Sequence, residues 1–233
     1  MRRRVPRSHD KPAPPRVRPP RGRTLREQED GPPDALKILD ISRRIDEKTP
    51  VWPGDVPFRW RSTARLIEGT LFESTCFTMS AHVGTHVDAP SHVMPDAAPI
   101  GRLALGAFMG PARVVDLPGR GEIGPDALPR PCFGTPRVLL RTGGRAFLSP
   151  LAALRLAERG ALLVGTDAMS VDPEDAADLP VHKTLLSRGV AILESLDLSE
   201  ASPGAYTLVA LPLFFRELDA SPVRAILIKE FSK

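Results

Sequence analysis

The sequence predicts one α/β domain. Three observations support this fold class: apolar segments patterned like strands, a helix with signals at both of its ends, and a strand–helix–strand succession over residues 137–164. The chain has 233 residues, of which 42% are hydrophobic and 26% charged. These values suit a soluble domain with a substantial core.

The expected elements follow one another from residue 36 onward. Strands are expected at residues 36–42, 113–117, 137–141, 161–164, 190–193, 206–211 and 223–228, and a Pro-Gly loop at residues 51–55. The clearest helix begins at Pro150, with Ser149 as its N-cap, and stops at Gly160. A second helix begins near His182 and ends at Gly189.

The first 34 residues differ from the rest in composition. They hold eight prolines, and their nine Arg and one Lys against five acids give a net charge of +5. Such a segment buries too little apolar surface to offset its ordering entropy, so we predict a disordered basic tail over residues 1–34. An arm that binds RNA or a membrane surface is the alternative for this tail. The folded domain then spans residues 35–233.

The charge of the chain resides in this tail. The net charge of the whole chain is +4, which leaves the domain with −1 and without a basic stripe or interleaved aromatic residues. A nucleic-acid partner is therefore disfavoured, and the lack of a run of 18 apolar residues disfavours a membrane span. The two cysteines, Cys76 and Cys132, suit a reducing cytoplasm and are too few for a cysteine-based metal site.

Residues 119–124 match the G-x-G-x-x-G pattern of dinucleotide-binding turns. That reading requires a helix to open at the third glycine. Three prolines at positions 125, 129 and 131 leave no room for one, so we expect a glycine-rich surface loop. The G-x-S-x-G motif of serine hydrolases does not occur.

Three histidines and one aspartate fall within eleven residues: His82, His86, Asp88 and His92. Their even positions would place them on one face of an extended chain. In a straight strand, however, His82 and His86 would be about 13 Å apart, too far for one ion, so we predict a bend at Gly84. A single histidine is usually solvated or satisfied in a core, but this group favours a metal site, and imidazole with carboxylate suits Zn²⁺ or Mn²⁺.

The segment His82–His92 resembles the H-x-G-[TA]-H-x-D-x-P-x-H signature of the bacterial cyclase-like metal hydrolases, whose best-known members are kynurenine formamidases (arylformamidases). Further blocks resemble the same family at residues 40–42, 51–55, 164–167, 170–173, 192–194, 211–213 and 221–225. The resemblance covers about residues 36–228. It implies a swivelling β/β/α domain with a mixed sheet and flanking helices. It also implies self-association, usually as a homodimer, with a higher homo-oligomer as the alternative.

The resemblance also implies a two-metal site. His82, His86 and Asp88 would bind one divalent ion, and Asp88 would bridge to a second ion bound by His182. Glu194 would bridge both. Zinc is the first expectation and manganese the second.

Two further roles are implied. His92 would be the catalytic acid/base, and Trp52 would line the pocket of a small aromatic amide substrate. The implied reaction is hydrolysis of N-formyl-L-kynurenine to L-kynurenine and formate, in tryptophan degradation, by a metal-activated water.

Two positions depart from the formamidase pattern. Val93 stands where these enzymes often carry Tyr, and Lys183 stands where they often have a second His. Isatin hydrolysis, or hydrolysis of a lactone or cyclic amide, therefore stays open as an alternative. A non-catalytic metal-binding protein is a remote one, because it would have no use for the unliganded His92.

Overall fold

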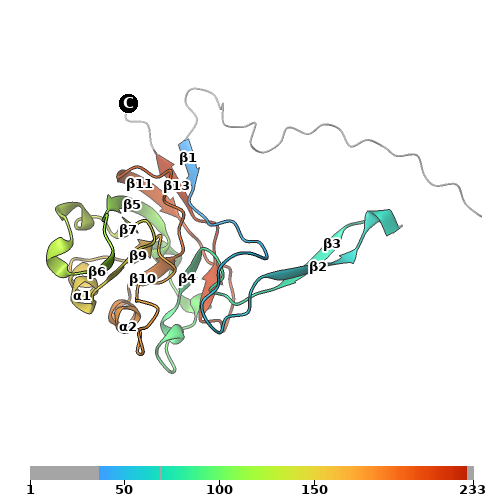
Figure 1. Cartoon of the computed structure of the whole chain (residues 1–233), viewed down its shortest axis with the longest axis horizontal. Coiled ribbons are helices and arrows are strands. Elements are labelled where there is room, and N and C mark those ends of the chain that lie inside the picture. The colour runs from blue at the N-terminus through green and yellow to red at the C-terminus, as the bar shows by residue number, and fades with distance from the viewer. Residues whose placement is uncertain (1–36, 69, 230–233) are drawn as a thin grey trace, which may run out of the picture. The chain divides into compact units, whose positions relative to one another are not determined.

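A computed structural model describes residues 37–68 and 70–229 (Figure 1), so the expected tail at residues 1–34 lies outside the described residues. The described residues form a sheet of nine strands, which are, in order across the sheet, β1 (Lys37–Asp40), β13 (Ile226–Lys229), β11 (Gly204–Val209), β5 (Met109–Asp116), β7 (Arg137–Arg141), β9 (Leu163–Thr166), β10 (Ala191–Glu194), β4 (His86–Asp88) and β12 (Ala220–Pro222). The four central strands, β5, β7, β9 and β10, run parallel to one another. Every other pair of neighbouring strands in this sheet is antiparallel. The predicted α/β class with a mixed sheet is confirmed.

Two apolar cores lie on the two faces of the sheet. Because side chains alternate along a strand, Val138 and Leu140 of β7 join one core and Leu139 joins the other. Helices α1 (Pro150–Glu158) and α2 (Pro180–Leu186) contact each other and pack over the first core. Residues of the curled sheet itself, such as Val114 of β5 and Leu227 of β13, fill much of the second.

The first helix follows its sequence signals closely. Ser149 Oγ accepts a hydrogen bond from Ala152 N at 3.1 Å, Pro150 is the first helical residue, and Gly160 takes a φ of +85° just after the helix. Helix α2 begins at Pro180, two residues earlier than expected, because proline fits the first helical position. Strand β9 lies two residues later than expected and β11 two residues earlier, while β5 begins four residues earlier and β13 three residues later.

Residues 119–124 are not entirely a loop. Strand β6 (Gly121–Ile123) pairs in parallel with β8 (Ala146–Leu148), so the loop expectation is wrong for these three residues. Their pairing partner lies 25 positions away, which the local sequence does not reveal. A 3₁₀ turn at Pro125–Ala127 follows, where a dinucleotide-binding turn would open an α-helix.

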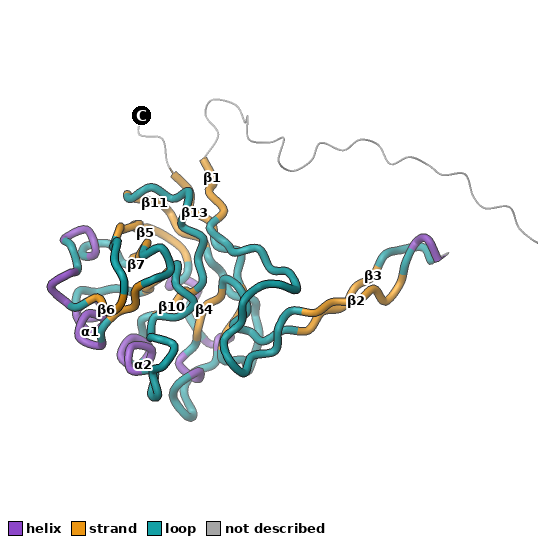
Figure 2. Tube along the Cα trace, in the orientation of Figure 1, coloured by secondary structure: helices purple, strands orange, loops and turns teal. Residues whose placement is uncertain are grey.

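An unexpected hairpin precedes the histidine segment. Strands β2 (Arg59–Ala64) and β3 (Ser74–Thr78) are antiparallel, with Trp60 opposite Phe77. Figure 2 shows both strands leaving the sheet. Large apolar side chains on this hairpin are exposed, namely Trp60, Leu66, Ile67, Leu71, Phe72 and Phe77.

The remaining elements are short. The described residues contain 3₁₀ turns at Leu66–Glu68, Pro90–His92, Ile100–Arg102, Leu105–Ala107, Pro125–Ala127 and Arg130–Cys132. None of the helices in the described part of the chain is long and apolar enough to cross a membrane.

Candidate metal centre

The His82–His92 segment bends twice. Only its middle, β4, is extended; His82 lies in a turn before it, and Pro90–His92 forms a 3₁₀ turn after it. Gly84 has a φ of +74°, and a Cβ there would lie 2.7 Å from Ile45 Cγ1. The predicted bend at Gly84 is confirmed. The extended part is limited to β4, and the turns before and after it bring the polar side chains together.

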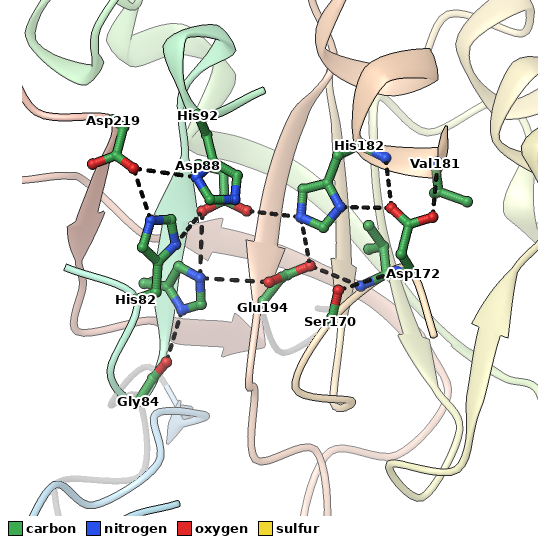
Figure 3. Close-up of polar contacts among 12 residues, drawn as sticks. His82, Gly84, Asp88, His92, Ser170, Asp172, Val181, His182, Glu194 and Asp219 are labelled. Atoms are coloured by element: carbon green, nitrogen blue, oxygen red, sulfur yellow. Dashed lines mark hydrogen bonds and ion pairs between the residues drawn. The ribbon is translucent and has the colours of Figure 1, made fainter. Parts of the chain in front are cut away.

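Neighbouring elements supply the other residues. β10 pairs antiparallel with β4, and this register places Glu194 opposite His86 and Ile192 opposite Asp88. Helix α2 contacts β10 and carries His182. Figure 3 shows the side chains of Asp88, His182 and Glu194 turned toward one another. The fold thus gathers residues that are up to 112 positions apart.

One group of donor atoms surrounds Asp88 Oδ1. This oxygen lies 3.0 Å from His82 Nδ1 and 3.3 Å from His86 Nε2. His86 Nε2 also lies 3.5 Å from Glu194 Oε2. One donor atom each of His82, His86 and Asp88 lies within 4.8 Å of the others, so a single cation can reach all three.

A second group surrounds the other oxygen of the same carboxylate. His182 Nε2 lies 3.5 Å from Asp88 Oδ2 and 3.3 Å from Glu194 Oε1. Val171 N donates to Glu194 Oε1 at 2.7 Å and so holds this carboxylate. Burial favours the neutral form of Asp88, but His86 and His182 outweigh it and keep its pKa well below the usual range. Asp88 and Glu194 each face both groups, as bridging ligands must.

In His86 and His182, the Nε2 atom faces the carboxylates, and the other ring nitrogen, Nδ1, contacts an oxygen atom on its far side. His86 Nδ1 lies 2.9 Å from Gly84 O, and His182 Nδ1 lies 2.7 Å from Asp172 Oδ2. Asp172 also accepts from the backbone of His182 at 3.0 Å, which fixes the start of α2 against the site. An acceptor on the far nitrogen orients a metal-binding imidazole and sets its tautomer.

The donor set fits a divalent cation. In the described part of the chain, His86 Nε2 and both carboxylate oxygens of Asp88 are buried without a hydrogen-bond partner, which costs about 1–3 kcal/mol for each such group. Two donors bound tetrahedrally to one ion at about 2.1 Å would be about 3.4 Å apart. The Nε2 atoms of His86 and His182 lie 3.3–3.5 Å from carboxylate oxygens of Asp88 and Glu194, and these four separations match that value.

The buried carboxylates also draw positive charge to the imidazoles. Burial opposes protonation of His86, but Asp88 and Glu194 outweigh it and raise its pKa to about 10. Burial likewise opposes protonation of His82, but the nearby carboxylates of Asp219 and Asp88 outweigh it and raise its pKa to about 9. Cation binding must therefore release protons from these rings, which makes it pH-dependent.

His92 lies beside these donor groups. Its ring centroid is 4.3 Å from that of His82 and 5.6 Å from that of His182. Its Nδ1 lies 3.2 Å from Asp219 Oδ2, and its side chain is 24% exposed. The ring is therefore reachable from solvent yet close to both groups of donor atoms.

A cavity of about 140 Å³ opens over the donor atoms. It is lined by four of the expected ligands, His82, His86, His182 and Glu194, and by His92, Trp52, Met169 and Leu179. Trp52 is half-buried and belongs to neither apolar core. Its indole therefore gives the cavity an aromatic wall.

Two carboxylates at the site were not expected. The carboxylate of Asp172 is within hydrogen-bond distance of the ring of His182, and that of Asp219 is within hydrogen-bond distance of the rings of His82 and His92. Asp172 belongs to a segment that resembles the family, and Asp219 lies two residues before another such segment, at residues 221–225. This proximity was the only available signal. Their spacing from the histidines carries no pattern, because tertiary pairing creates the contacts.

Comparisons with known proteins agree with this geometry. Residues 39–173 match a family model described as putative cyclase. The chain is 41% identical over 202 residues to the kynurenine formamidase of Geobacillus thermodenitrificans, and the alignment covers 82% of this chain and 97% of that protein.

Solved structures share the fold. A potential metal-dependent hydrolase with cyclase activity has a TM-score of 0.74 at 29% identity, covering 85% of this chain and 100% of that one. Isatin hydrolase A from Labrenzia aggregata has a TM-score of 0.71 at 24% identity, covering 84% of this chain and 94% of that one. Fold and site define a hydrolase whose side chains fit a metal ion. The chain belongs to the putative cyclase family, which confirms the resemblance seen in its sequence.

Proposed function

We propose that this hydrolase is a metal-dependent aryl formamidase that converts N-formyl-L-kynurenine to L-kynurenine and formate. The observation that carries the proposal is one cavity lined by four of the expected metal ligands, the additional His92 and the indole of Trp52. The 41% identity to a kynurenine formamidase supports the substrate class.

We further propose that the chain binds two divalent cations, with zinc preferred over manganese. His82, His86 and Asp88 would hold one ion, and Asp88, His182 and Glu194 the other, with Glu194 also reaching the first ion as a bridge. When bound, such ions provide a nucleophile from water at neutral pH and polarise the carbonyl of the substrate.

His92 is the residue that moves the proton. It lies next to both donor groups and lines the cavity. An imidazole suits this task because its ring nitrogens can accept a proton and donate one. His92 takes a proton from the attacking water and gives one to the departing aryl nitrogen.

Trp52 selects the substrate class. An aromatic ring packed on an indole gains about 0.5–1.5 kcal/mol beyond the burial of apolar area. The aryl group of a formylated kynurenine would therefore bind against this wall of the cavity, with its formamide over the donor atoms.

A substrate panel tests the proposal. Zinc-reconstituted protein is assayed on N-formylkynurenine, isatin and a simple lactone, before and after chelation. We expect the formamide to give the highest kcat/KM and chelation to abolish its hydrolysis. Preference for isatin or the lactone would overturn the substrate, and activity that survives complete metal removal would overturn the metal dependence.

We also propose that the enzyme is a homodimer joined through the β2–β3 hairpin. An isolated two-stranded hairpin is marginally stable in water, and monomers rarely expose contiguous large apolar patches. On this hairpin Leu71 is 95% and Ile67 84% exposed. A second copy of the chain would cover these side chains, and sedimentation measurements on the full chain would detect the dimer.

We place the enzyme in the cytoplasm. Cys76 and Cys132 are not joined to each other, and Cys132 is buried. Unpaired thiols suit a reducing compartment.

A further inference from the structure

Asp219 joins two parts of the site that the proposed function treats separately. Its Oδ2 lies 3.0 Å from Nε2 of His82, an expected metal ligand, and 3.2 Å from Nδ1 of His92, the expected acid/base (Figure 3). One carboxylate oxygen therefore holds both rings.

The backbone around Asp219 is fixed on the strand that carries the metal ligands. Asp219 O accepts from Ala89 N at 2.8 Å, and Leu218 O accepts from Ile100 N at 2.8 Å. The next residue, Ala220, begins β12 and lies opposite Asp88 in the β4 pairing. The carboxylate is thus placed by the same strand register that places Asp88.

An ionised carboxylate only accepts hydrogen bonds, so each ring must present N–H to it. For His82 the proton that remains once a cation binds then lies on Nε2, and the lone pair of Nδ1 is left toward the donor group around Asp88 Oδ1, which is 3.0 Å away. For His92 the proton lies on Nδ1, and the lone pair of Nε2 is left free to accept a proton. Both rings are thereby held in the tautomer that their proposed tasks require.

We propose that Asp219 is a positioning residue that sets the tautomer and orientation of His82 and His92 together. The inference rests on the proposed function for what the two rings do, but the two hydrogen bonds stand without it. Asp219 couples metal binding at His82 to proton transfer at His92.

A third cation is the competing explanation for the same atoms. One atom each of His82, His92 and Asp219 lies within 4.8 Å of the others. The separations of 3.0 and 3.2 Å to one shared oxygen, however, are those of direct hydrogen bonds. Metal content therefore distinguishes positioning from ligation.

The tautomers can be read directly from the full chain by ¹⁵N-resolved NMR of its histidines, at a pH where the ring of His92 is neutral. With zinc bound, we expect His92 to carry its proton on Nδ1, and in Asp219→Asn to shift toward the Nε2–H form that free histidine prefers. The matched control is Asp40→Asn, because Asp40 has a similarly exposed side chain that pairs with Arg224 instead. An Nε2–H proton on His92 of the unsubstituted protein would overturn the inference.

Metal affinity and turnover supply the second readout. Loss of a carboxylate behind a metal-binding histidine typically costs about 10–100-fold in affinity or activity. We expect Asp219→Asn to keep its melting temperature and its full metal content at saturating zinc. Its zinc affinity and its kcat should each fall about 10–100-fold, with KM little changed. Loss of a whole equivalent of zinc at saturation would make Asp219 a ligand and overturn the positioning role.

A double-substitution cycle separates this inference from the proposed function. If Asp219 acts through His92, Asp219→Asn should lower kcat at saturating zinc far less when His92 is already alanine. Additive losses would overturn the coupling while leaving the acid/base role of His92 intact. If His92→Ala alone leaves kcat unchanged, the proposed function fails, and the NMR tautomers still decide whether Asp219 positions the rings.

Discussion

The candidate metal centre buries charged side chains, whereas the β2–β3 hairpin exposes apolar ones. Asp88 at the centre is 0% exposed although it is charged, whereas Leu71 at the hairpin tip is 95% exposed although it is apolar. Buried charges are normally paired, and large apolar patches are normally covered. The proposed function accounts for both departures: a cation would compensate the buried charge of Asp88, and a second copy of the chain would cover the exposed side chains of the hairpin.

The two regions also differ in how the fold supports them. Two strands hold β4 from either side, with Glu194 and Pro222 both in register with His86. The hairpin strands pair with each other alone among the described strands. Changes at the centre should therefore affect chemistry strongly and hairpin changes should affect assembly.

Removing a bridging carboxylate should have the largest effect. We expect Glu194→Ala to lose both ions and to reduce turnover at least about 10³-fold, because several kcal/mol of charge stabilisation disappear with the metal. Elemental analysis and kcat/KM check this, with Glu122→Ala on the exposed side of β6 as the control. Retention of two ions in Glu194→Ala would show that it is not a bridge.

Removal of the acid/base should affect turnover without affecting metal content. We expect His92→Ala to retain its ions and to lose about 10²–10⁴-fold in kcat, the range for a positioned acid/base. His182→Ala is the contrasting variant, since it should lose the second ion and keep the first. Metal loss from His92→Ala would make His92 a ligand instead.

The aromatic wall should contribute less. We expect Trp52→Ala to raise KM for aryl formamides about 2- to 12-fold, the equivalent of 0.5–1.5 kcal/mol. A small aliphatic formamide should hardly be affected. Trp60→Ala on the hairpin is the matched control, because this second tryptophan is 53% exposed. A fall in stability of about 3–5 kcal/mol in Trp52→Ala, with both substrates affected alike, would show a core residue instead.

Hairpin substitutions should have the smallest effect on the chemistry of each chain. We expect Leu71→Ser combined with Phe72→Ser to convert a dimer to monomers while metal content stays the same. Exposed positions away from structural features usually change stability by less than about 0.5 kcal/mol. Analytical ultracentrifugation checks this, and a dimer that persists unchanged would place the interface elsewhere.

The sequence predicts those elements whose signals are local. Strand β7 lies at residues 137–141 as expected, and α1 is defined by Ser149, Pro150 and Gly160. The hairpin was missed because β2 reads Arg-Trp-Arg-Ser-Thr-Ala, with few of the alternating apolar residues that indicate a strand.

The residues of the site likewise divide into those that local sequence spacing indicates and those that only the family resemblance or the fold reveals. The close spacing of His82, His86 and Asp88 indicates a metal site by itself. His182 and Glu194 could be assigned only through the family resemblance. Asp219 lies 127 positions from His92, and only the β12–β4 register places it there. Sequence spacing therefore identifies the nucleus of the site, whereas the residues that orient it depend on the fold.

Anomalous diffraction from crystals of the zinc-loaded full chain tests the central claim most directly, because it locates each ion by its own scattering. We expect two zinc positions per chain, one among His82, His86 and Asp88 and one among Asp88, His182 and Glu194. A chain that binds less than one zinc, or that binds it away from Asp88, would contradict the account.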